Sequence, residues 1–297
     1  MTEKGLYSIA RLKELQESFG FEFKKALGQN FLIDGNIIRK IAEESGITKD
    51  TTVMEIGPGI GTLTEELAKH AKKVIAFELD ESLREIHKET LGPHDNAHVI
   101  YKDFMDASED EIKSLTGGAF KVCANLPYYV TTPILTFLLE SKLEIDSITV
   151  MVQKEVAQRI VADEKSKDYG SISVFTRAYG DARIAFNVSK DCFYPKPKVD
   201  SAVLYIKKKK KDLANEELFL KIIRASFMKR RKTLANALFN SEVGIDKKDT
   251  VNALKTIGKG ENARAEELSF DDFVNITKDL EGIYGKYTIN SRRIRRD

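Results

Sequence analysis

Four consecutive residues, Asn125-Leu126-Pro127-Tyr128, follow an apolar run from Phe120 to Ala124 that is typical of a buried strand. An exocyclic amine on a nucleobase is a weak nucleophile, because its lone pair is delocalised into the ring. The Asn125 side-chain carbonyl and the Leu126 backbone carbonyl would accept its two N–H groups and favour a tetrahedral nitrogen, while Tyr128 would stack on the ring. The tetrapeptide therefore indicates methylation of a planar amine. The alternative is a Pro-Tyr turn that closes a buried strand.

A glycine-rich turn, Gly57-Pro58-Gly59-Ile60-Gly61, follows an earlier strand-like run. Glycines at such a turn let a cofactor approach the backbone, and Glu78, 21 positions after Gly57 (78 minus 57), ends the next strand-like run and would accept hydrogen bonds from two ribose hydroxyls. The spacing is Gly-x-Gly-x-Gly rather than the Gly-x-Gly-x-x-Gly of dinucleotide sites, which favours S-adenosylmethionine over NAD. A Gly-Pro turn without a ligand is the competing interpretation.

Two further patterns adjoin this expected cofactor site. Asp103, just beyond a third strand-like run, would accept from the adenine amino group of the cofactor, although an isolated Asp there is typical of a turn or an N-cap. Thr62 and Glu65 have the spacing of a capping box for the next helix. We expect no metal site, disulfide or iron–sulfur cluster, because neither cysteines nor histidines have the necessary spacing. These residues are Cys123, Cys192, His70, His87, His94 and His98.

Strand and helix patterns alternate through the first two thirds of the chain, which predicts a doubly wound, mainly parallel α/β sheet. Strand-like runs are Thr51 to Ile56, Lys73 to Phe77, His98 to Tyr101, Phe120 to Ala124, Ser147 to Val152, Ala182 to Val188 and Ala202 to Ile206. Helical patterns are Ser8 to Phe19, Asn36 to Ser45, Leu63 to His70, Glu81 to Thr90 and Pro133 to Glu140.

The pattern changes after residue 208, where only helical spacing follows. These expected helices are Glu216 to Met228, Lys232 to Phe239, Lys247 to Ile257 and Phe270 to Leu280. A chain of 297 residues is long enough for two cores. We therefore predict a methyltransferase domain over residues 1–208, with an N-terminal leader at 1–25, and a small all-helical domain over residues 209–297.

Basic residues are concentrated in the last third, although the formal net charge is only +2. The runs are Lys207 to Lys211, Lys229-Arg230-Arg231-Lys232 and Arg292-Arg293-Ile294-Arg295-Arg296. One such run is usually a solvated face, but three together favour a polyanionic partner such as nucleic acid. No apolar stretch approaches the length of a membrane span and no secretion signal begins the chain, so we expect a cytoplasmic protein.

Six segments resemble, in order, the ribosomal RNA adenine dimethyltransferase family, specifically its bacterial small-subunit members. They are Leu27-Gly28-Gln29-Asn30-Phe31-Leu32, Glu55 to Gly61, Glu78, Asp103-Phe104, Asn125 to Tyr128 and Phe193 to Ser201. The resemblance implies a Rossmann-like class I methyltransferase domain. It also implies that Tyr128 and Phe193 face the two sides of the target adenine, and that the S-adenosylmethionine site is lined by Asn30, Leu32, Gly57, Glu78, Asp103 and Asn125. By themselves, Asn30 and Leu32 suggest only a leader folded onto the sheet, and Phe193 a core aromatic.

The reaction implied by this resemblance is direct in-line methyl transfer to a flipped-out adenine, twice on one nitrogen, without a metal or a covalent enzyme intermediate. The expected substrate is two adjacent adenosines in a terminal hairpin loop of 16S rRNA, in the small ribosomal subunit or its precursor. We expect a monomer whose helical domain binds rRNA.

Three alternatives remain at this point. A large-subunit rRNA methyltransferase of the antibiotic-resistance type shares both motifs, but the long leader and the Phe193 to Ser201 segment favour the small-subunit type. A non-catalytic RNA-binding or transcription factor on the same fold is disfavoured by the intact acidic residue and tetrapeptide. Methylation of a protein glutamine amide is disfavoured by the basic helical tail.

Overall fold

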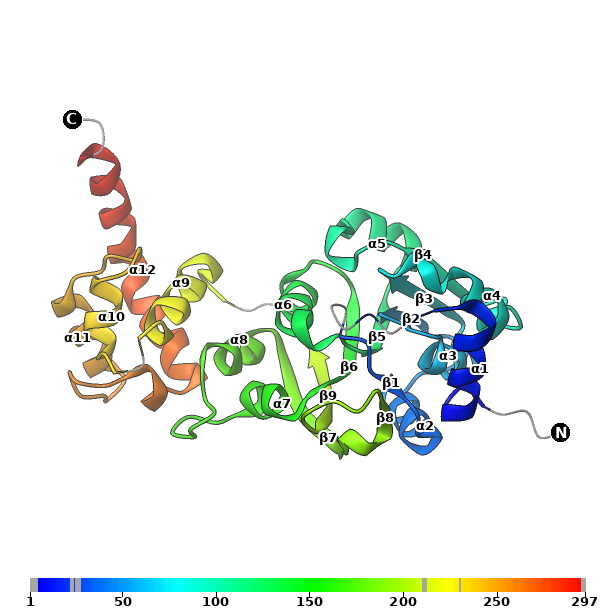
Figure 1. Ribbon diagram of the computed structural model, residues 1–297. Coiled ribbons are helices and arrows are strands. Elements are labelled where there is room, and N and C mark those ends of the chain that lie inside the picture. The colour runs from blue at the N-terminus through cyan, green and yellow to red at the C-terminus, as the bar shows by residue number, and fades with distance from the viewer. Residues whose placement is uncertain (1–4, 22–23, 25–27, 210–212, 230, 295–297) are drawn as a thin grey trace. The chain divides into compact units, whose positions relative to one another are not determined.

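The computed structural model describes residues 5–21, 24, 28–209, 213–229 and 231–294, with the side chains of the last helix described to residue 284. The chain divides into two compact units, whose elements are labelled in Figure 1. The first comprises Met1–Ala157 and Ala182–Lys208, and the second Gln158–Asp181 and Lys209–Asp297.

The predicted boundary after residue 208 coincides with the end of the first unit, but residues 158–181 belong to the second unit and not to the predicted domain 1–208. Two buried tyrosines account for this. The Tyr169 hydroxyl donates to the Leu268 carbonyl at 2.8 Å, and the Tyr179 hydroxyl donates to the Glu216 carboxylate at 2.6 Å. Composition does not reveal such long-range contacts. The sequence therefore did not indicate that the chain enters the second unit at residue 158 and returns to the first at residue 182.

The first unit is built around a seven-stranded sheet with the order β4-β3-β2-β5-β6-β9-β7. Neighbouring strands from β4 to β6 pair in parallel, whereas β6 and β9 pair antiparallel. This arrangement confirms the predicted mainly parallel α/β sheet. The strands are β2 Thr52–Ile56, β3 Lys73–Glu78, β4 Ala97–Tyr101, β5 Phe120–Asn125, β6 Ile145–Gln153, β7 Gly180–Val188 and β9 Ser201–Lys208.

The sheet has a topological switch point between β2 and β5. From β2 the chain proceeds outward to β3 and β4, then returns to β5 on the other side of β2. In open α/β sheets, ligands bind at such a point, beyond the carboxyl ends of the strands. Gly57 follows β2 and Asn125 ends β5, so the fold itself brings the two chemical motifs to one edge.

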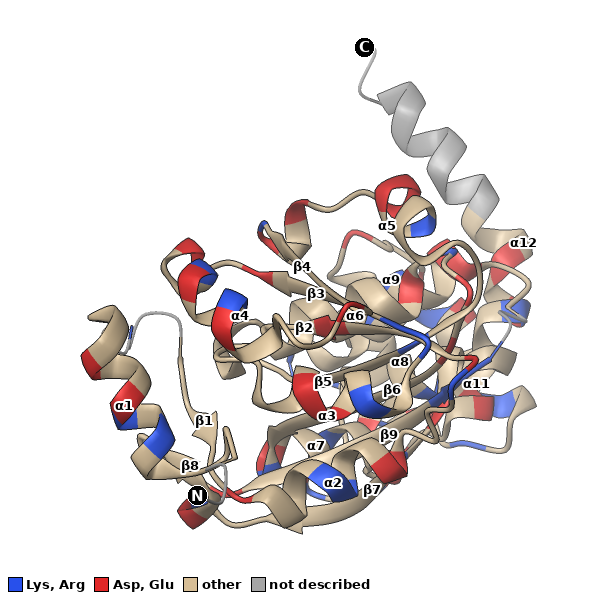
Figure 2. Ribbon diagram, turned by 90° about the vertical axis from the view of Figure 1, so that its right-hand side faces the viewer, with Lys and Arg blue, Asp and Glu red and all other residues tan. Residues whose placement is uncertain are grey.

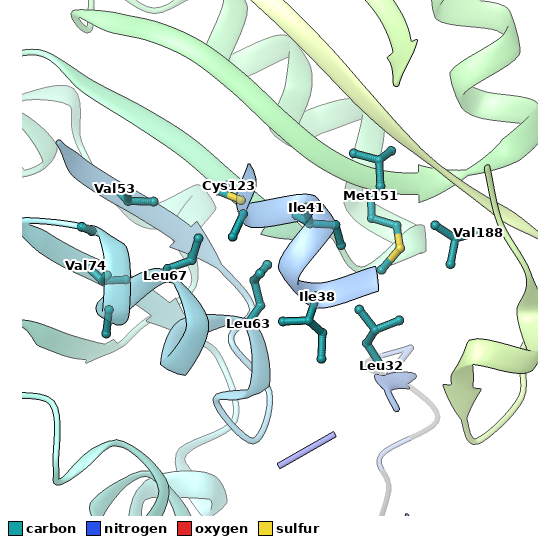
Figure 3. Close-up of a cluster of buried hydrophobic side chains, with 14 of the residues drawn as sticks. Leu32, Ile38, Ile41, Val53, Leu63, Leu67, Val74, Cys123, Met151 and Val188 are labelled. Carbon is teal, nitrogen blue, oxygen red and sulfur yellow. The ribbon is translucent and has the colours of Figure 1, made fainter. Parts of the chain in front are cut away.

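A core of apolar side chains holds helices α2 (Gly35–Glu44) and α3 (Thr62–His70) against the sheet. Figure 3 shows Ile38 and Ile41 of α2 and Leu63 and Leu67 of α3 beside Val53, Val74, Cys123 and Met151 from four strands. Ile41 and Leu67 are fully buried. Burying each such side chain contributes about 1.5–3 kcal/mol, so this layer fixes the strands that carry the site.

Helix α3 begins without the predicted capping box. Its N-cap is Gly61, with φ of +90°, and no side chain caps the helix. Thr62 is instead the first helical residue, and its hydroxyl is buried without a hydrogen-bond partner among the described residues. The capping-box prediction was therefore wrong, because a left-handed glycine occupies the capping position.

Further helices surround the first unit. Those predicted are α1 Ile9–Phe19, α4 Arg84–Leu91 and α6 Thr131–Glu140, whereas α5 Glu109–Thr116 was not predicted. Figure 2 shows basic and acidic residues interspersed on α1, α4 and α5. Ion pairs such as Lys88–Glu85 and Lys113–Glu109 account for this mixed surface, which agrees with the small net charge.

The second unit is helical, as predicted for the C-terminal region. Its helices are α8 Ser171–Tyr179, α9 Glu216–Phe227, α10 Leu234–Phe239, α11 Lys247–Thr256 and α12 Phe270–Ile294, and α7 Lys154–Val161 leads into it. Fully buried Phe219 and Phe273 lie in its core, and Phe219 makes an edge-on contact with Phe270 at 5.9 Å between ring centroids. Helix α12 extends past the predicted end at Leu280. None of the helices in the described part of the chain has an apolar stretch long enough to cross a membrane.

The basic runs differ in their contacts and exposure. Lys208 belongs to the first run, but its ammonium donates to the carbonyls of Leu138 and Ser141 at 2.8 and 2.9 Å and so caps the end of α6. Residues 210 and 211, Arg230, and 295 and 296 lie outside the described residues, as do the side chains of 292–294. Lys229, Arg231 and Lys232 lie between α9 and α10 and are exposed.

Candidate active site

One pocket lies at the carboxyl ends of β2 and β5, with an empty volume of about 1150 Å³ including its open mouth. Of the nine residues predicted for the site, Phe193 is not among those that line this pocket. The eight that do line it are Asn30, Leu32, Gly57, Glu78, Asp103, Asn125, Leu126 and Tyr128. We call the Gly57, Glu78 and Asp103 side the cofactor edge, and the Asn125, Leu126 and Tyr128 side the base edge.

The glycine turn presents bare backbone to the pocket. Gly57 and Gly59 have φ of +73° and +59°, which a side chain would strain. A Cβ on Gly59 would also lie 2.8 Å from the Phe31 ring. Phe31 in turn makes an edge-on contact with Phe21 of the leader, at 6.3 Å between centroids. Phe31 thus covers one side of the turn, and Phe21 of the leader packs behind it.

Glu78 is held rigidly at the end of β3. Its Oε2 accepts from the Gly59 N–H at 3.1 Å and its Oε1 from the Asp80 N–H at 2.7 Å, and the residue is only 6% exposed. Burial raises the pKa of Glu78 to about 7, although the two backbone hydrogen bonds lower it. A fixed carboxylate of this kind suits two vicinal hydroxyl donors.

Asp103 fulfils the ordinary role foreseen for it while lining the pocket. It is the N-cap of a short 3-10 helix, Phe104–Asp106, and its Oδ1 accepts from the Met105 N–H at 2.9 Å. This bond fixes the carboxylate and uses one of its two oxygens. The capping and ligand-binding interpretations are therefore compatible.

Asn125 is oriented by the segment before β1 (Phe31–Leu32). Its Nδ2 donates to the Asn30 carbonyl at 3.3 Å, and the Asn30 side chain donates to the Gly28 carbonyl at 2.8 Å. Because the amide nitrogen is turned toward Asn30, the Oδ1 atom is the end that remains to accept from an amine.

The rest of the tetrapeptide is fixed from two directions. The Leu126 N–H donates to the Met151 carbonyl of β6 at 3.1 Å. The Tyr128 hydroxyl and the Ser201 hydroxyl of β9 are 2.6 Å apart. Burial raises the pKa of Tyr128, so its phenol is neutral near pH 7. The hydrogen bond between the Tyr128 and Ser201 hydroxyls holds the Tyr128 ring at the pocket wall.

Phe193 lies in the core and not among the residues that line the pocket. It lies in β8 (Phe193–Tyr194), which pairs with β1 so that Leu32 is opposite Phe193. The ring is 2% exposed and belongs to the core of α2, α3 and the sheet. This two-stranded sheet, which was not predicted, joins the Leu27 to Leu32 motif to the Phe193 to Ser201 motif.

Two residues near the site were missed by sequence reasoning. Glu55 is 1% exposed, its Oε2 has no hydrogen-bond partner among the described residues, and burial raises its pKa to about 8. His87 is 2.6 Å from the Gly59 carbonyl through Nε2 and 2.8 Å from the Tyr101 hydroxyl through Nδ1. Burial lowers the pKa of His87, so the ring is neutral near pH 7. The place of Glu55 before the glycine turn was a usable signal, whereas His87 gave none.

The residues of the cofactor edge fit S-adenosylmethionine. The fixed carboxylate of Glu78 can accept from ribose hydroxyls, and that of Asp103 can accept from an adenine amine. The bare backbone at Gly57 leaves space for the amino-acid chain. No group of three or more His, Cys, Asp or Glu in the described residues is arranged to hold a metal.

Comparison with known proteins agrees with this geometry. A family model described as ribosomal RNA adenine dimethylase matches residues 20–281. The ribosomal RNA small subunit methyltransferase A of Geobacillus thermodenitrificans is 42% identical over 292 residues, which cover 95% of this chain and 99% of the relative.

This chain belongs to the ribosomal RNA adenine dimethylase family. It is an S-adenosylmethionine-dependent methyltransferase. A crystal structure of a dimethyladenosine transferase from Plasmodium falciparum has the same fold, with a TM-score of 0.71 and 23% identity over 86% of this chain and 98% of that one. The 23S rRNA methyltransferase ErmE aligns with a TM-score of 0.65 and 26% identity, over 85% of this chain and all of that one.

Proposed function

We propose that this family member dimethylates two adjacent adenosines in a terminal hairpin loop of 16S rRNA, in the small ribosomal subunit or its precursor. The observation that carries the chemistry is the Asn125 amide, whose nitrogen is turned to Asn30 in the pocket that also holds Glu78. The subunit is supported by the small-subunit relative, which is 42% identical, against 26% for the 23S enzyme.

At the cofactor edge, Glu78 binds the ribose hydroxyls, Asp103 accepts from the adenine amine, and Gly57 allows close approach of the methionine portion. Asn30 and Leu32 complete that wall. When bound, S-adenosylmethionine supplies a methyl group that its sulfonium has already activated. The protein's task is therefore to hold and polarise the acceptor.

At the base edge, the Asn125 Oδ1 and the Leu126 carbonyl accept the two N–H groups of the adenine amine. Their partial negative charges stabilise the positive charge that grows on this nitrogen during transfer. The proton then leaves to water. A monomethylated amine keeps one N–H, so one of the two acceptors still binds it in the second round.

Tyr128 stacks on one face of the adenine, and the Tyr128–Ser201 contact of 2.6 Å fixes its ring in advance. The same proposal gives Phe193 the opposite face. Because this ring is 2% exposed, direct stacking requires the β1–β8 pair to rearrange when the base enters.

The helical unit binds rRNA phosphates through the exposed Lys229, Arg231 and Lys232, together with Arg230. Such contacts position RNA without reading its sequence, so the choice of adenosines falls to the loop shape and the pocket. The enzyme acts as a cytoplasmic monomer.

The test is mass spectrometry of nucleosides after incubation with S-adenosylmethionine and either immature small subunits or free large-subunit rRNA. Primer extension then locates the modified bases. We expect dimethyladenosine at two neighbouring positions of a small-subunit hairpin. Dimethyladenosine only in large-subunit rRNA would replace this proposal with the resistance-type activity, and unmodified RNA in both would contradict it.

A further inference from the structure

Asp80 is a buried carboxylate that does not line the pocket. It is 3% exposed and lies two residues after Glu78. Its Oδ1 accepts from the Lys24 ammonium at 2.6 Å and from the Ser82 N–H and hydroxyl at 3.1 and 2.5 Å. Its Oδ2 accepts from the Gln29 side-chain amide at 2.9 Å. Nothing in the methyl-transfer chemistry uses this carboxylate.

Two of these donors, Lys24 and Gln29, come from the segment before β1, more than fifty positions earlier in the chain. Lys24 and Gln29 are themselves joined, because the Lys24 N–H donates to the Gln29 Oε1 at 2.8 Å. Lys24, Gln29 and Asp80 therefore form a closed ring of hydrogen bonds. This ring fixes the backbone immediately before Asn30.

Asp80 also connects the two edges of the pocket. On one side, the Asp80 N–H donates to the Glu78 Oε1 at 2.7 Å. On the other, Gln29 precedes Asn30, whose carbonyl accepts from the Asn125 amide at 3.3 Å. A continuous path of contacts thus runs from the ribose-binding carboxylate through Asp80 to the amide at the reacting amine.

The charge on Asp80 is needed for this ring. Burial would raise the pKa of Asp80, but hydrogen bonds from Lys24, Ser82 and Gln29 lower it below the ordinary value. The carboxylate is therefore ionised and accepts from all its donors. A buried charge is tolerated only when it is paired in this way, so losing it leaves Lys24 and Gln29 without their acceptor.

We propose that Asp80 is a positioning residue that fastens Gln29 and Asn30 to the cofactor edge and so holds the Asn125 Oδ1 toward the target amine. This inference rests on the proposed role of Asn125. It makes methyl transfer from bound cofactor depend on a carboxylate that contacts neither substrate.

A purely structural role for Asp80 is the competing explanation, since its donors also attach the leader to the first unit. That attachment has other supports. Leu12 and Leu15 of α1 belong to a buried cluster with Leu83 and Ile86, and Arg11 pairs with Glu89 of α4. Glu89→Gln is therefore a matched control, because it removes a leader ion pair but no contact to the 28–30 segment.

The experiment compares the full-length parent with Asp80→Asn, Lys24→Met and Glu89→Gln. Cofactor affinity is measured by calorimetry, transfer by single turnover at saturating cofactor, and stability by thermal unfolding. We expect Asp80→Asn to slow transfer about 10–10²-fold, the scale of a misplaced catalytic group, with a smaller effect for Lys24→Met and none for Glu89→Gln. Because the cofactor is saturating, weaker cofactor binding cannot explain the slower transfer by Asp80→Asn.

A double-mutant cycle separates positioning from general destabilisation. If Asp80 acts through Asn125, Asp80→Asn in the Asn125→Ala background should add little to the rate loss. The proposal would be overturned if the rate losses of the two single variants multiply in the double variant. A normal single-turnover rate for a folded Asp80→Asn would also overturn it. Lys24→Met carries the same test should Asp80→Asn fail to fold, and a normal rate for it would then overturn the ring as a positioning device.

A readout without RNA distinguishes this proposal from the proposed function. Hydrogen exchange of the backbone over residues 28–32 should accelerate in Asp80→Asn and stay unchanged in Glu89→Gln. If exchange is faster in Asp80→Asn but the parent does not methylate the RNA, the assigned substrate is wrong and the role of the ring in holding residues 28–32 is supported. Unchanged exchange in Asp80→Asn would mean that the ring does not hold this segment.

Discussion

At the cofactor edge of the pocket, backbone groups hold the recognition side chains, whereas at the base edge the side chains depend on distant segments. Glu78 accepts from the N–H groups of Gly59 and Asp80, all close to the ends of β2 and β3. Asn125 instead depends on Asn30, 95 residues earlier, and Tyr128 on Ser201, 73 residues later. The first edge is formed by the local turn, and the second only when Asn30 and β9 are in place.

Replacing Asn125 should produce the largest effect on this comparison. We expect Asn125→Ala to lower single-turnover transfer about 10²–10³-fold, the usual loss for a positioned polar stabiliser, with cofactor affinity at most modestly weakened. Rapid-quench measurement with purified variant tests this. A near-normal rate would remove Asn125 from the chemistry.

Glu78→Ala should affect the opposite edge. Loss of charge-assisted hydrogen bonds to the ribose is expected to weaken S-adenosylmethionine binding by about 1.5–3 kcal/mol. Calorimetry measures this directly, and Glu66→Gln, on α3 and outside the pocket lining, is a suitable control. Equal affinities for Glu78→Ala and the control would contradict the assignment.

The two aromatic residues differ in how they would reach the flipped base. Tyr128 already lines the pocket, whereas Phe193 is buried and would need the β1–β8 pair to rearrange. Tyr128→Ala and Phe193→Ala should each weaken engagement of the flipped base by about 1–3 kcal/mol, with cofactor affinity nearly constant. Tyr128→Phe keeps the ring and should retain most engagement.

Stability distinguishes the two positions further. Phe193→Ala removes a core ring and should also lower the free energy of unfolding by about 3–5 kcal/mol. Phe193→Leu fills most of that space without an aromatic face, so full methylation by this variant would show that Phe193 serves the core and not the base. Leu should likewise rescue less than Trp at position 128.

The pH dependence follows from the raised pKa of Glu78, about 7 against an ordinary 4.5. Folded protein holds this proton over that interval while unfolded protein releases it, so the group's contribution to stability falls as pH rises from 4.5 to 7. In its proposed role, Glu78 accepts from the ribose hydroxyls as a carboxylate, so cofactor binding is expected to need the ionised form. Affinity should therefore drop up to about tenfold per pH unit below 7 and level off above it. Glu78→Gln should remove this dependence, and an unchanged pH profile would contradict it.

The basic cluster should give the smallest and least specific effect. Neutralising Lys229, Arg230, Arg231 and Lys232 should flatten the salt dependence of subunit binding by about 0.7–0.9 log unit per lost phosphate contact. The site of methylation should stay the same. Identical affinity and slope across a salt series would show that this cluster is only a solvated face.

Much of the fold was predictable because it depends on local pattern. The runs at 73–77 and 120–124 became β3 and β5, each ending on the residue that carries its motif. The alternation of strand and helix also predicted the mainly parallel sheet.

The failures have long-range or conformational causes. The capping box failed because Gly61 adopts φ of +90° one position earlier. The Asp80 ring joins Lys24 and Asp80 across 56 positions, and His87 reaches Gly59 across 28, without any periodic signal. The burial of Phe193 follows from the pairing of β8 with β1, and strands of two residues leave no periodic pattern in a sequence. Its contact with the target adenine stays a prediction.

The most direct test of a pocket with two separately built edges is a crossed measurement on Glu78→Ala and Asn125→Ala. Each variant is titrated with S-adenosylmethionine by calorimetry and then assayed for single-turnover dimethylation of small subunits at saturating cofactor. We expect Glu78→Ala to lose affinity but to transfer at close to the parent rate once saturated, and Asn125→Ala to bind cofactor but to transfer about 10²–10³-fold more slowly. If both variants lose affinity and saturated rate in equal proportion, the division into a cofactor edge and a base edge is wrong.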